Sequence, residues 1–138
     1  MARTRFENLR VYQLAEEIAD LSWVVVAKWS QLAQNTVGRQ LINSADSIGA
    51  NIAEGSGRGS YADNRRFAKI SRGSLFEVKH WLRRAYKRKL LNKKEVKKFQ
   101  ELTEELTPKL SAYINSIGRK SAINDQQPTS NKQQATDK

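Results

Sequence analysis

The sequence has no cysteine, and His80 is the single histidine among its 138 residues. A disulfide framework and a thiolate zinc site are therefore excluded, and a histidine-based metal site has no second histidine. Because His80 lies between Lys79 and Trp81 in a basic segment, we interpret it as a surface residue. We predict no catalytic residue, no metal, no cofactor and no enzymatic activity.

Long apolar runs are also missing. No stretch approaches the roughly 20 apolar residues that a membrane-spanning helix needs. The N-terminus does not combine a basic start, an apolar core and a small-residue cleavage site. We therefore expect a soluble, cytoplasmic protein with no membrane partner, and the chain length suits one domain with a tail.

Apolar residues recur every three or four positions in four segments, which predicts four amphipathic helices. The segments cover about residues 7–29, 36–55, 60–88 and 92–118, and no run alternates with the period of two that a strand requires. Short connections between helices of this length favour an all-α fold, an antiparallel up-down four-helix bundle over residues 1–118. Residues 119–138 have little to bury, and we expect a disordered polar tail there.

Local signals mark where these helices begin and end. The N-terminal caps are expected at Thr36, at Ser60 with Asp63 in a near capping box, and at Asn92 with Glu95 in a capping box. Gly55 is expected to end the second helix in a left-handed conformation. Pro108 should bend or split the last helix, because it removes a backbone donor.

Positive charge is concentrated in one segment. The chain carries a net charge of +11, and residues 65–98 contain fourteen Lys or Arg against Glu77 and Glu95, a net charge of +12. The remaining residues are close to neutral in sum. A charge localised in this way is typical of a protein that meets an anionic partner such as nucleic acid.

Cations on the third helix fall in a line opposite its apolar stripe. The expected core stripe is Phe67, Ile70, Ser74, Val78, Trp81 and Ala85, widened at one edge by Leu75, Leu82 and Tyr86. At about 100° per residue, the following cations lie within about 40° of one direction and form the cationic line: Arg65, Lys69, Arg72, Lys79, Arg83 and Lys87. Such a line can follow a phosphate backbone, although an ordinary solvated surface is the alternative.

More cations gather where the third helix meets the fourth. We name as the basic corner the residues Lys87, Arg88, Lys89, Lys93, Lys94, Lys97 and Lys98. Four of these lysines start a helix, where the macrodipole disfavours positive charge, so solubility alone does not require them there. The predicted nucleic-acid contacts are Arg65, Arg66, Lys69, Arg72, Lys79, Arg83, Arg84, Lys87, Arg88, Lys93, Lys94 and Lys97.

Three aromatic residues are candidates for an oligomer interface. Tyr12 and Trp23 belong to a second apolar stripe on the first helix, about 100° from the first stripe, and one core cannot easily use both. Phe76 projects from the middle of the cationic line, where it could stack on a base or contact another subunit, and we favour the contact. We therefore predict a homo-oligomer.

The glycine-rich segment 55–60 raises the question of a phosphate-binding loop, because Arg58 lies among glycines just before a helix. The segment lacks the Gly-Lys-Ser/Thr ending of a P-loop and does not follow a strand. We interpret it as a helix cap and a tight reversal, with Asn51 and Glu54 bonding the loop backbone.

Three ordered motifs resemble one known family: FENLRVYQ at 6–13, NIAEGSGR at 51–58 and GSLFE at 73–77. The chain is similar over residues 6–117 to the four-helix bundle proteins, also called ribosomal-RNA intervening-sequence proteins. The resemblance implies an antiparallel four-helix bundle, ring-like homopentamers and no established enzymatic activity. A distant branch resembles the accessory variability proteins that serve a reverse transcriptase in retroelements.

Two functions remain open from the sequence. The first is a non-enzymatic, oligomeric protein that binds nucleic acid, RNA before DNA, through the cationic line and the basic corner. The second is a protein-protein scaffold or an accessory subunit, for example of a reverse transcriptase, whose basic surface meets an acidic or ribonucleoprotein partner.

Overall fold

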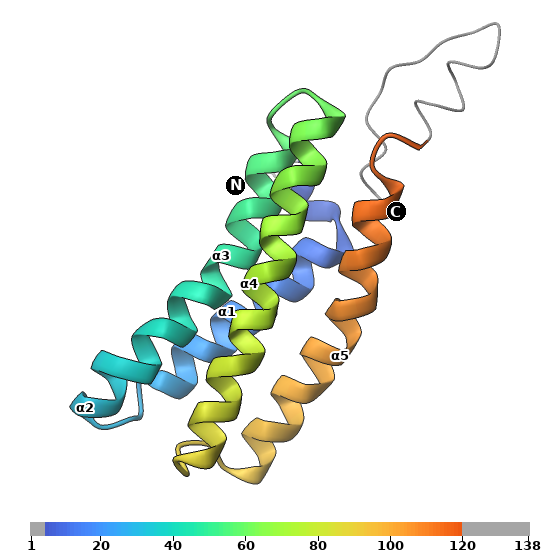
Figure 1. Ribbon diagram of the computed structural model, residues 1–138. Coiled ribbons are helices and arrows are strands. Elements are labelled where there is room, and N and C mark those ends of the chain that lie inside the picture. The colour runs from blue at the N-terminus through green and yellow to red at the C-terminus, as the bar shows by residue number, and fades with distance from the viewer. Residues whose placement is uncertain (1–4, 120–138) are drawn as a thin grey trace, which may run out of the picture.

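Four long helices, each running opposite to the one before it, make up the fold (Figure 1). The computed structural model describes residues 5–119. The long helices are α1 (Arg10–Val26), α3 (Arg39–Ser56), α4 (Tyr61–Lys87) and α5 (Lys93–Ser116). Shorter pieces are a 3₁₀ turn (Phe6–Asn8), α2 (Gln31–Ala33) and a π-helical turn (Gln34–Gly38) that leads into α3. The all-α prediction is confirmed, and the described residues contain no strand.

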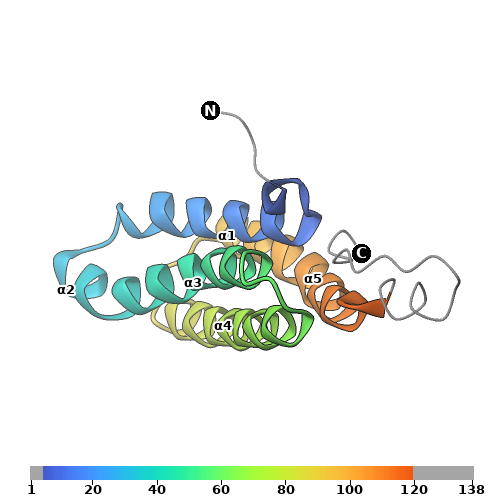
Figure 2. The same ribbon diagram turned by 90° about the horizontal axis from the view of Figure 1, so that it is seen from above.

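The helices form a closed ring in the order α1, α3, α4, α5, and α5 returns to pack on α1 (Figure 2). Each helix therefore touches two neighbours, while α1 and α4 lie diagonally across the bundle. The largest fully buried side chains include Tyr113, Phe99, Leu14, Ile48 and Leu75. None of the helices within residues 5–119 is long and apolar enough to cross a membrane.

Side chains cap the N-termini of three helices, α2, α4 and α5. Ser60 accepts a hydrogen bond from the Asp63 N–H (3.1 Å), and Asn92 and Glu95 form the complete reciprocal capping box (2.8 and 2.9 Å). The expected cap at Thr36 is wrong, because the chain is already helical from Gln31. Ser30 caps that turn, and the Thr36 hydroxyl instead donates to the carbonyl of the preceding helical turn.

Two expectations about helix ends also change. Gly55 lies inside α3, and the left-handed glycine of this connection is Gly59, at φ +87°. A β-carbon on Gly55 would stand 2.8 Å from the Asn64 Oδ1 atom and 2.9 Å from the Phe67 Cβ atom, so this glycine permits α3 and α4 to approach each other. Pro108 does not split α5, which continues through it to Ser116. The expected polar tail lies outside the described residues except for Arg119.

Polar contacts hold the first helix to the last part of the chain. The Arg10 guanidinium donates two hydrogen bonds of 3.1 Å to Glu105 on α5. At the other end of α1, Lys28 contacts Glu95 at 2.6 Å, and the Trp29 indole N–H donates to the Leu90 carbonyl at 2.9 Å. The linker after α1 is therefore attached to the turn between α4 and α5, and the basic corner has a fixed support.

Candidate nucleic-acid interface

The core side of α4 is rotated from the side that the sequence predicted. Ser74, Val78 and Ala85 of the expected stripe are buried, as is Leu75 at its edge. Asn64, Ala68 and Ser71, which the stripe did not include, are buried as well, whereas Ile70 of the expected stripe is 44 % exposed. The small side chains permit close packing on α3, where the Ser71 hydroxyl donates to a backbone carbonyl of that helix. Hydrophobicity predicted that large apolar residues such as Ile70 would face the core, but the narrow space between α3 and α4 admits only small side chains such as Ala68 and Ser71.

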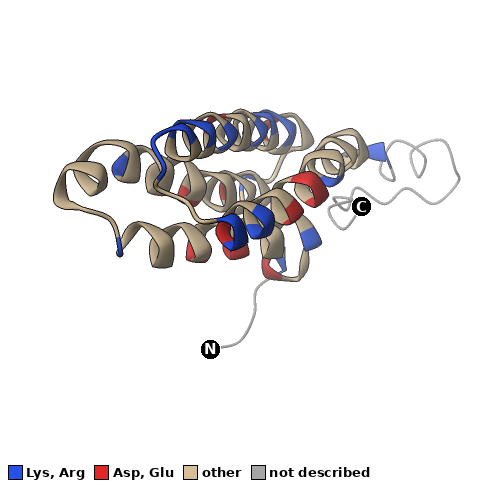
Figure 3. Cartoon of the chain, turned by 90° about the horizontal axis from the view of Figure 1, so that it is seen from below, with Lys and Arg blue, Asp and Glu red and all other residues tan. Residues whose placement is uncertain are grey.

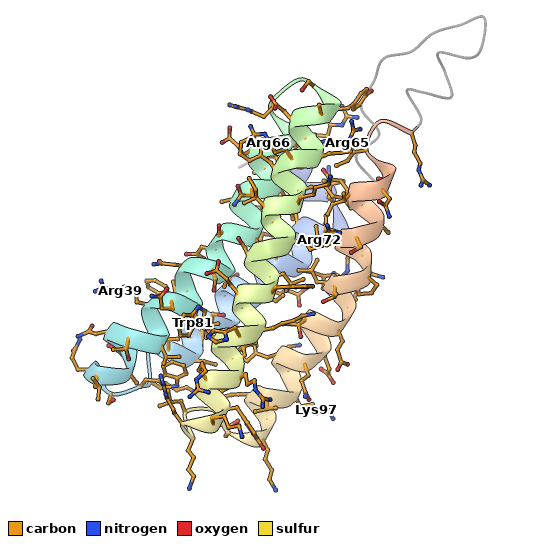
Figure 4. All side chains as sticks on the ribbon, in the orientation of Figure 1. Arg39, Arg65, Arg66, Arg72, Trp81 and Lys97 are labelled. Carbon is orange, nitrogen blue, oxygen red and sulfur yellow. The ribbon has the colours of Figure 1, made fainter. Side chains whose placement is uncertain are left out.

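This rotation turns one edge of the cationic line toward α5. The Arg65 guanidinium donates to the Ile117 carbonyl at 3.0 Å, and that of Arg72 makes a long contact of 3.5 Å with the Ser111 hydroxyl. Figure 4 shows both arginines on the α5 side of α4, while Arg66 points to the other side. Arg65 and Arg72 are half-buried. They therefore tie α4 to α5 in addition to contributing charge.

Three other members of the cationic line are more open to solvent. Lys69, Arg83 and Lys87 are exposed, and the described residues give none of them an ion-pair partner. Figure 3 shows Lys and Arg repeated along the length of α4. These side chains keep their charge available for an anion. Arg66 differs, because it pairs with Asp63 at 3.5 Å and lies over the Phe67 ring at 4.5 Å.

Every side chain of the basic corner is exposed. The corner is shaped by a Schellman motif, in which the Leu90 N–H donates to the Ala85 carbonyl (2.9 Å) and the Lys89 N–H donates to the Tyr86 carbonyl (3.0 Å). Lys89 holds the left-handed conformation, at φ 60°, that glycine usually takes in this motif. The nearby carboxylate of Glu95 is already engaged by Lys28, so within residues 5–119 the corner cations have no ion-pair partner.

Phe76 lies where the sequence placed it, on the outside of α4. Its ring is 57 % exposed, and the Lys79 ammonium lies 5.0 Å from the ring centroid in a cation–π contact. Such a pair presents a flat apolar surface beside a positive charge. It suits either an aromatic base or an apolar patch of another subunit.

The second apolar stripe of α1 is largely used within the chain itself. Val26 is buried, and Tyr12 is half-buried, with its ring edge-on to Phe6 at 4.9 Å and packed beside Gly49. The 3₁₀ turn and α3 therefore cover part of Tyr12, and its place in an oligomer interface stays a prediction. Trp23, in contrast, is 65 % exposed.

The glycine-rich connection is closed by internal contacts. Arg58 pairs with Glu54 (3.3 Å) and Asp63 (3.8 Å) and lies over the Phe67 ring at 5.1 Å. The Asn51 amide donates to Ser47 within α3, so it does not bond the loop as expected. These partners support the interpretation of the connection as a reversal, since its one arginine already has two carboxylates.

Sequence reasoning missed a groove between the C-terminal half of α4 and the start of α5. It has a volume of about 400 Å³, and its lining residues are Leu82, Arg83, Tyr86, Leu91, Val96, Phe99, Gln100 and Thr103. Leu82 and Tyr86 were expected at the edge of the core, but Tyr86 is 59 % exposed at the groove. The sequence signal for this groove is the presence of two leucines, Leu90 and Leu91, in a short turn close to Tyr86, because a turn rarely exposes so many apolar side chains without a surface for them to line.

The described residues offer no metal site, since no three His, Cys, Asp or Glu side chains come together among them. Glu77 and His80 do have the Glu-x-x-His spacing that bundle metal sites use. Both are exposed on the outside of α4, so they do not point into the bundle. The His80 ring packs edge-on against Trp81 at 4.7 Å, which agrees with a surface histidine.

Comparison with known proteins identifies the family. No curated protein matches the chain. A crystal structure from Bacteroides thetaiotaomicron, described as a protein of unknown function from the S23 ribosomal protein family, is similar in fold with a TM-score of 0.66. It is 21 % identical, over 75 % of this chain and 97 % of that one. The family model described as "23S rRNA-intervening sequence protein" matches residues 7–112. The chain therefore belongs to the 23S rRNA-intervening sequence protein family.

Proposed function

We propose that this is a non-enzymatic accessory protein that binds RNA in the cytoplasm through the cationic line and the basic corner. The main support is that Lys69, Arg83, Lys87 and the corner lysines are exposed and have no ion-pair partner within residues 5–119. Desolvated or paired cations would have little charge left for a ligand, whereas these can replace the counterions of phosphates. The family is named after inserts in 23S rRNA, which favours RNA over DNA as the anion.

The arrangement predicts affinity that depends strongly on salt and weakly on sequence. With about six phosphate contacts to a single strand, the association constant should fall by roughly two to three orders of magnitude between about 50 and 200 mM salt. An apolar protein-protein contact would change little over this range. RNA that is not retained even at low salt would overturn the proposal and favour an acidic protein as the partner of the basic surface.

Charge reversal tests which cations carry the binding. Arg83→Glu should weaken RNA binding and lower the salt dependence, and adding Lys87→Glu should nearly abolish retention at moderate salt. Arg39→Glu is the matched control, because Arg39 is an exposed arginine on α3, on another side of the bundle, and should have little effect (Figure 4). Binding is measured by fluorescence anisotropy with a labelled RNA of mixed sequence. Equal losses in both single variants would point to net charge rather than to this surface.

The protein is further proposed to act as a homo-oligomer, a pentameric ring being the form that the family resemblance implies. Exposed apolar side chains support this: Trp23 and Val24 near the end of α1, Leu32 in α2, and Phe76 on α4, which lies diagonally opposite α1. Apolar side chains on opposite sides suit a head-to-tail contact, which forms a ring where the rotation between subunits closes. Sedimentation of the protein and of Trp23→Ser tests the proposal, and a wild-type monomer at micromolar concentration would refute it.

A further inference from the structure

We propose that the groove between α4 and α5 receives an unpaired base of single-stranded RNA, with the Tyr86 ring as its stacking surface. This inference rests on the proposed function and names its ligand more narrowly. The groove borders the basic corner, because Tyr86 lies one residue before Lys87 and Leu91 lies in the turn that joins the two helices.

The walls of the groove have the chemistry that a base requires. Tyr86 is 59 % exposed, and the lining also includes Phe99, which is 2 % exposed, and Leu82. An exposed aromatic ring in an apolar lining suits the face of a base. On the opposite wall, Gln100 on α5 is exposed and carries an amide that can both donate to and accept from a base edge.

Charge surrounds the groove on both sides. Arg83 lines it from α4, with Lys79 and Lys87 about one helical turn before and after. On α5, Lys93 and Lys97 lie toward the same side as Gln100 at about 100° per residue, and Glu104 is the acid that follows one turn later. A strand that crosses the groove would thus have cations near its phosphates on either side of the inserted base.

The dimensions favour one base over an amphipathic protein helix. A helix in a groove needs anchor pockets spread over two or three turns. Here the α5 wall runs from Val96 to Thr103, about two turns, but the facing α4 wall extends only from Leu82 to Tyr86, about one turn, and it limits the enclosed length. In a duplex the bases are stacked and paired inside the helix, so only an unpaired base can enter. The groove therefore selects single-stranded RNA, while the cations alone would bind both forms.

The experiment compares Tyr86→Ala with Tyr86→Phe in anisotropy titrations against one short RNA, presented single-stranded and as its duplex. Tyr86→Ala should weaken single-strand binding by about 5- to 150-fold, the range that loss of one stacked base produces. Tyr86→Phe retains the ring and should bind as the wild type does. Duplex binding should be the same in all three proteins, because it uses only cations. A groove-filling variant, Val96→Trp, should reproduce the Tyr86→Ala effect while leaving Tyr86 in place.

The possible failures are distinguishable. If the wild type binds the single strand and Tyr86→Ala binds it equally well, the groove inference is overturned and the proposed function stands. Equal affinity of the wild type for single strand and duplex would overturn it as well. If neither RNA binds at low salt, the proposed function fails and this inference with it. Binding of an acidic helical peptide that Tyr86→Ala abolishes, with single-strand binding unchanged, would assign the groove to a protein partner. Far-ultraviolet circular dichroism establishes that each variant is folded.

Discussion

Adding one methyl group at Gly55 should destabilise the bundle, although alanine is the better helix former. The new β-carbon would meet the Asn64 Oδ1 atom at 2.8 Å, the Phe67 Cβ atom at 2.9 Å and the Asn64 carbonyl oxygen at 3.0 Å. Two of these three contacts are with the α4 main chain or a Cβ atom, so a rotamer change cannot relieve them. The helices α3 and α4 must instead move apart.

The two opposing effects can be compared. Overpacking of a close contact costs about 1–3 kcal/mol, and replacing a helical glycine with alanine recovers about 1 kcal/mol. We therefore expect Gly55→Ala to lower the free energy of unfolding by up to about 2 kcal/mol and the midpoint temperature by up to roughly 10 °C. Urea and thermal unfolding, followed by circular dichroism, measure both quantities.

Gly73→Ala is the matched control. Gly73 is an exposed helical glycine of α4, and a β-carbon there would meet nothing within 4 Å. This variant should gain about 0.5–1 kcal/mol from helix propensity alone. If Gly55→Ala proves as stable as Gly73→Ala, the argument that Gly55 sets the separation of α3 and α4 is refuted.

Three further predictions concern single side chains. Burial raises the pKa of Tyr113 to about 12, and the neighbouring Asn64 amide and Arg5 partly offset this rise. The phenol of the unfolded chain ionises near pH 10, whereas that of the folded chain stays protonated, so the free energy of unfolding should fall as the pH rises from 10 toward 12. Between about pH 9 and 11 the wild type should lose about 1 kcal/mol more than Tyr113→Phe in urea titrations. Burial raises the pKa of Glu95, but the hydrogen bonds from Lys28 and from the Asn92 N–H, together with the Lys28 charge, outweigh this effect and lower the pKa. Glu95→Gln should therefore reduce the free energy of unfolding by about 1 kcal/mol at neutral pH. The difference in stability between the wild type and this variant should disappear as the pH falls below the ordinary carboxyl pKa. Lys89→Gly should stabilise the fold by about 0.5–1 kcal/mol, because glycine adopts the left-handed conformation without steric cost. A variant less stable than the wild type would contradict the view that the backbone of Lys89 is strained.

The sequence was most informative where a signal is local. The capping pair Asn92 and Glu95 and the cap at Ser60 need only neighbouring residues, and both are present. Periodicity also identified the four long helices. It could not identify Ser30 as the cap of the second helical segment, because the π-helical turn shifts the register there.

The rotation of α4 could not be predicted, since it depends on a partner. Ser71 and Ala68 are weakly hydrophobic, and only the close approach of α3, permitted by Gly55, makes them core residues in place of Ile70. The same rotation brings Arg65 and Arg72 to the α5 boundary and leaves Arg83 and Lys87 outside. The general position of the basic surface was thus predictable from the sequence. Which of its cations bond to α5 and which remain exposed to solvent was not predictable.

Packing of α1 against α5 has a consequence for the order of folding. During synthesis α1, α3 and α4 emerge first and can associate, but the remaining side of α1 stays uncovered until the last helix has left the ribosome. Glu105, the partner of Arg10, is separated from it by 95 residues. Closing the ring is therefore a late, long-range step, and nascent chains that stall before α5 would present apolar surface to chaperones and to one another.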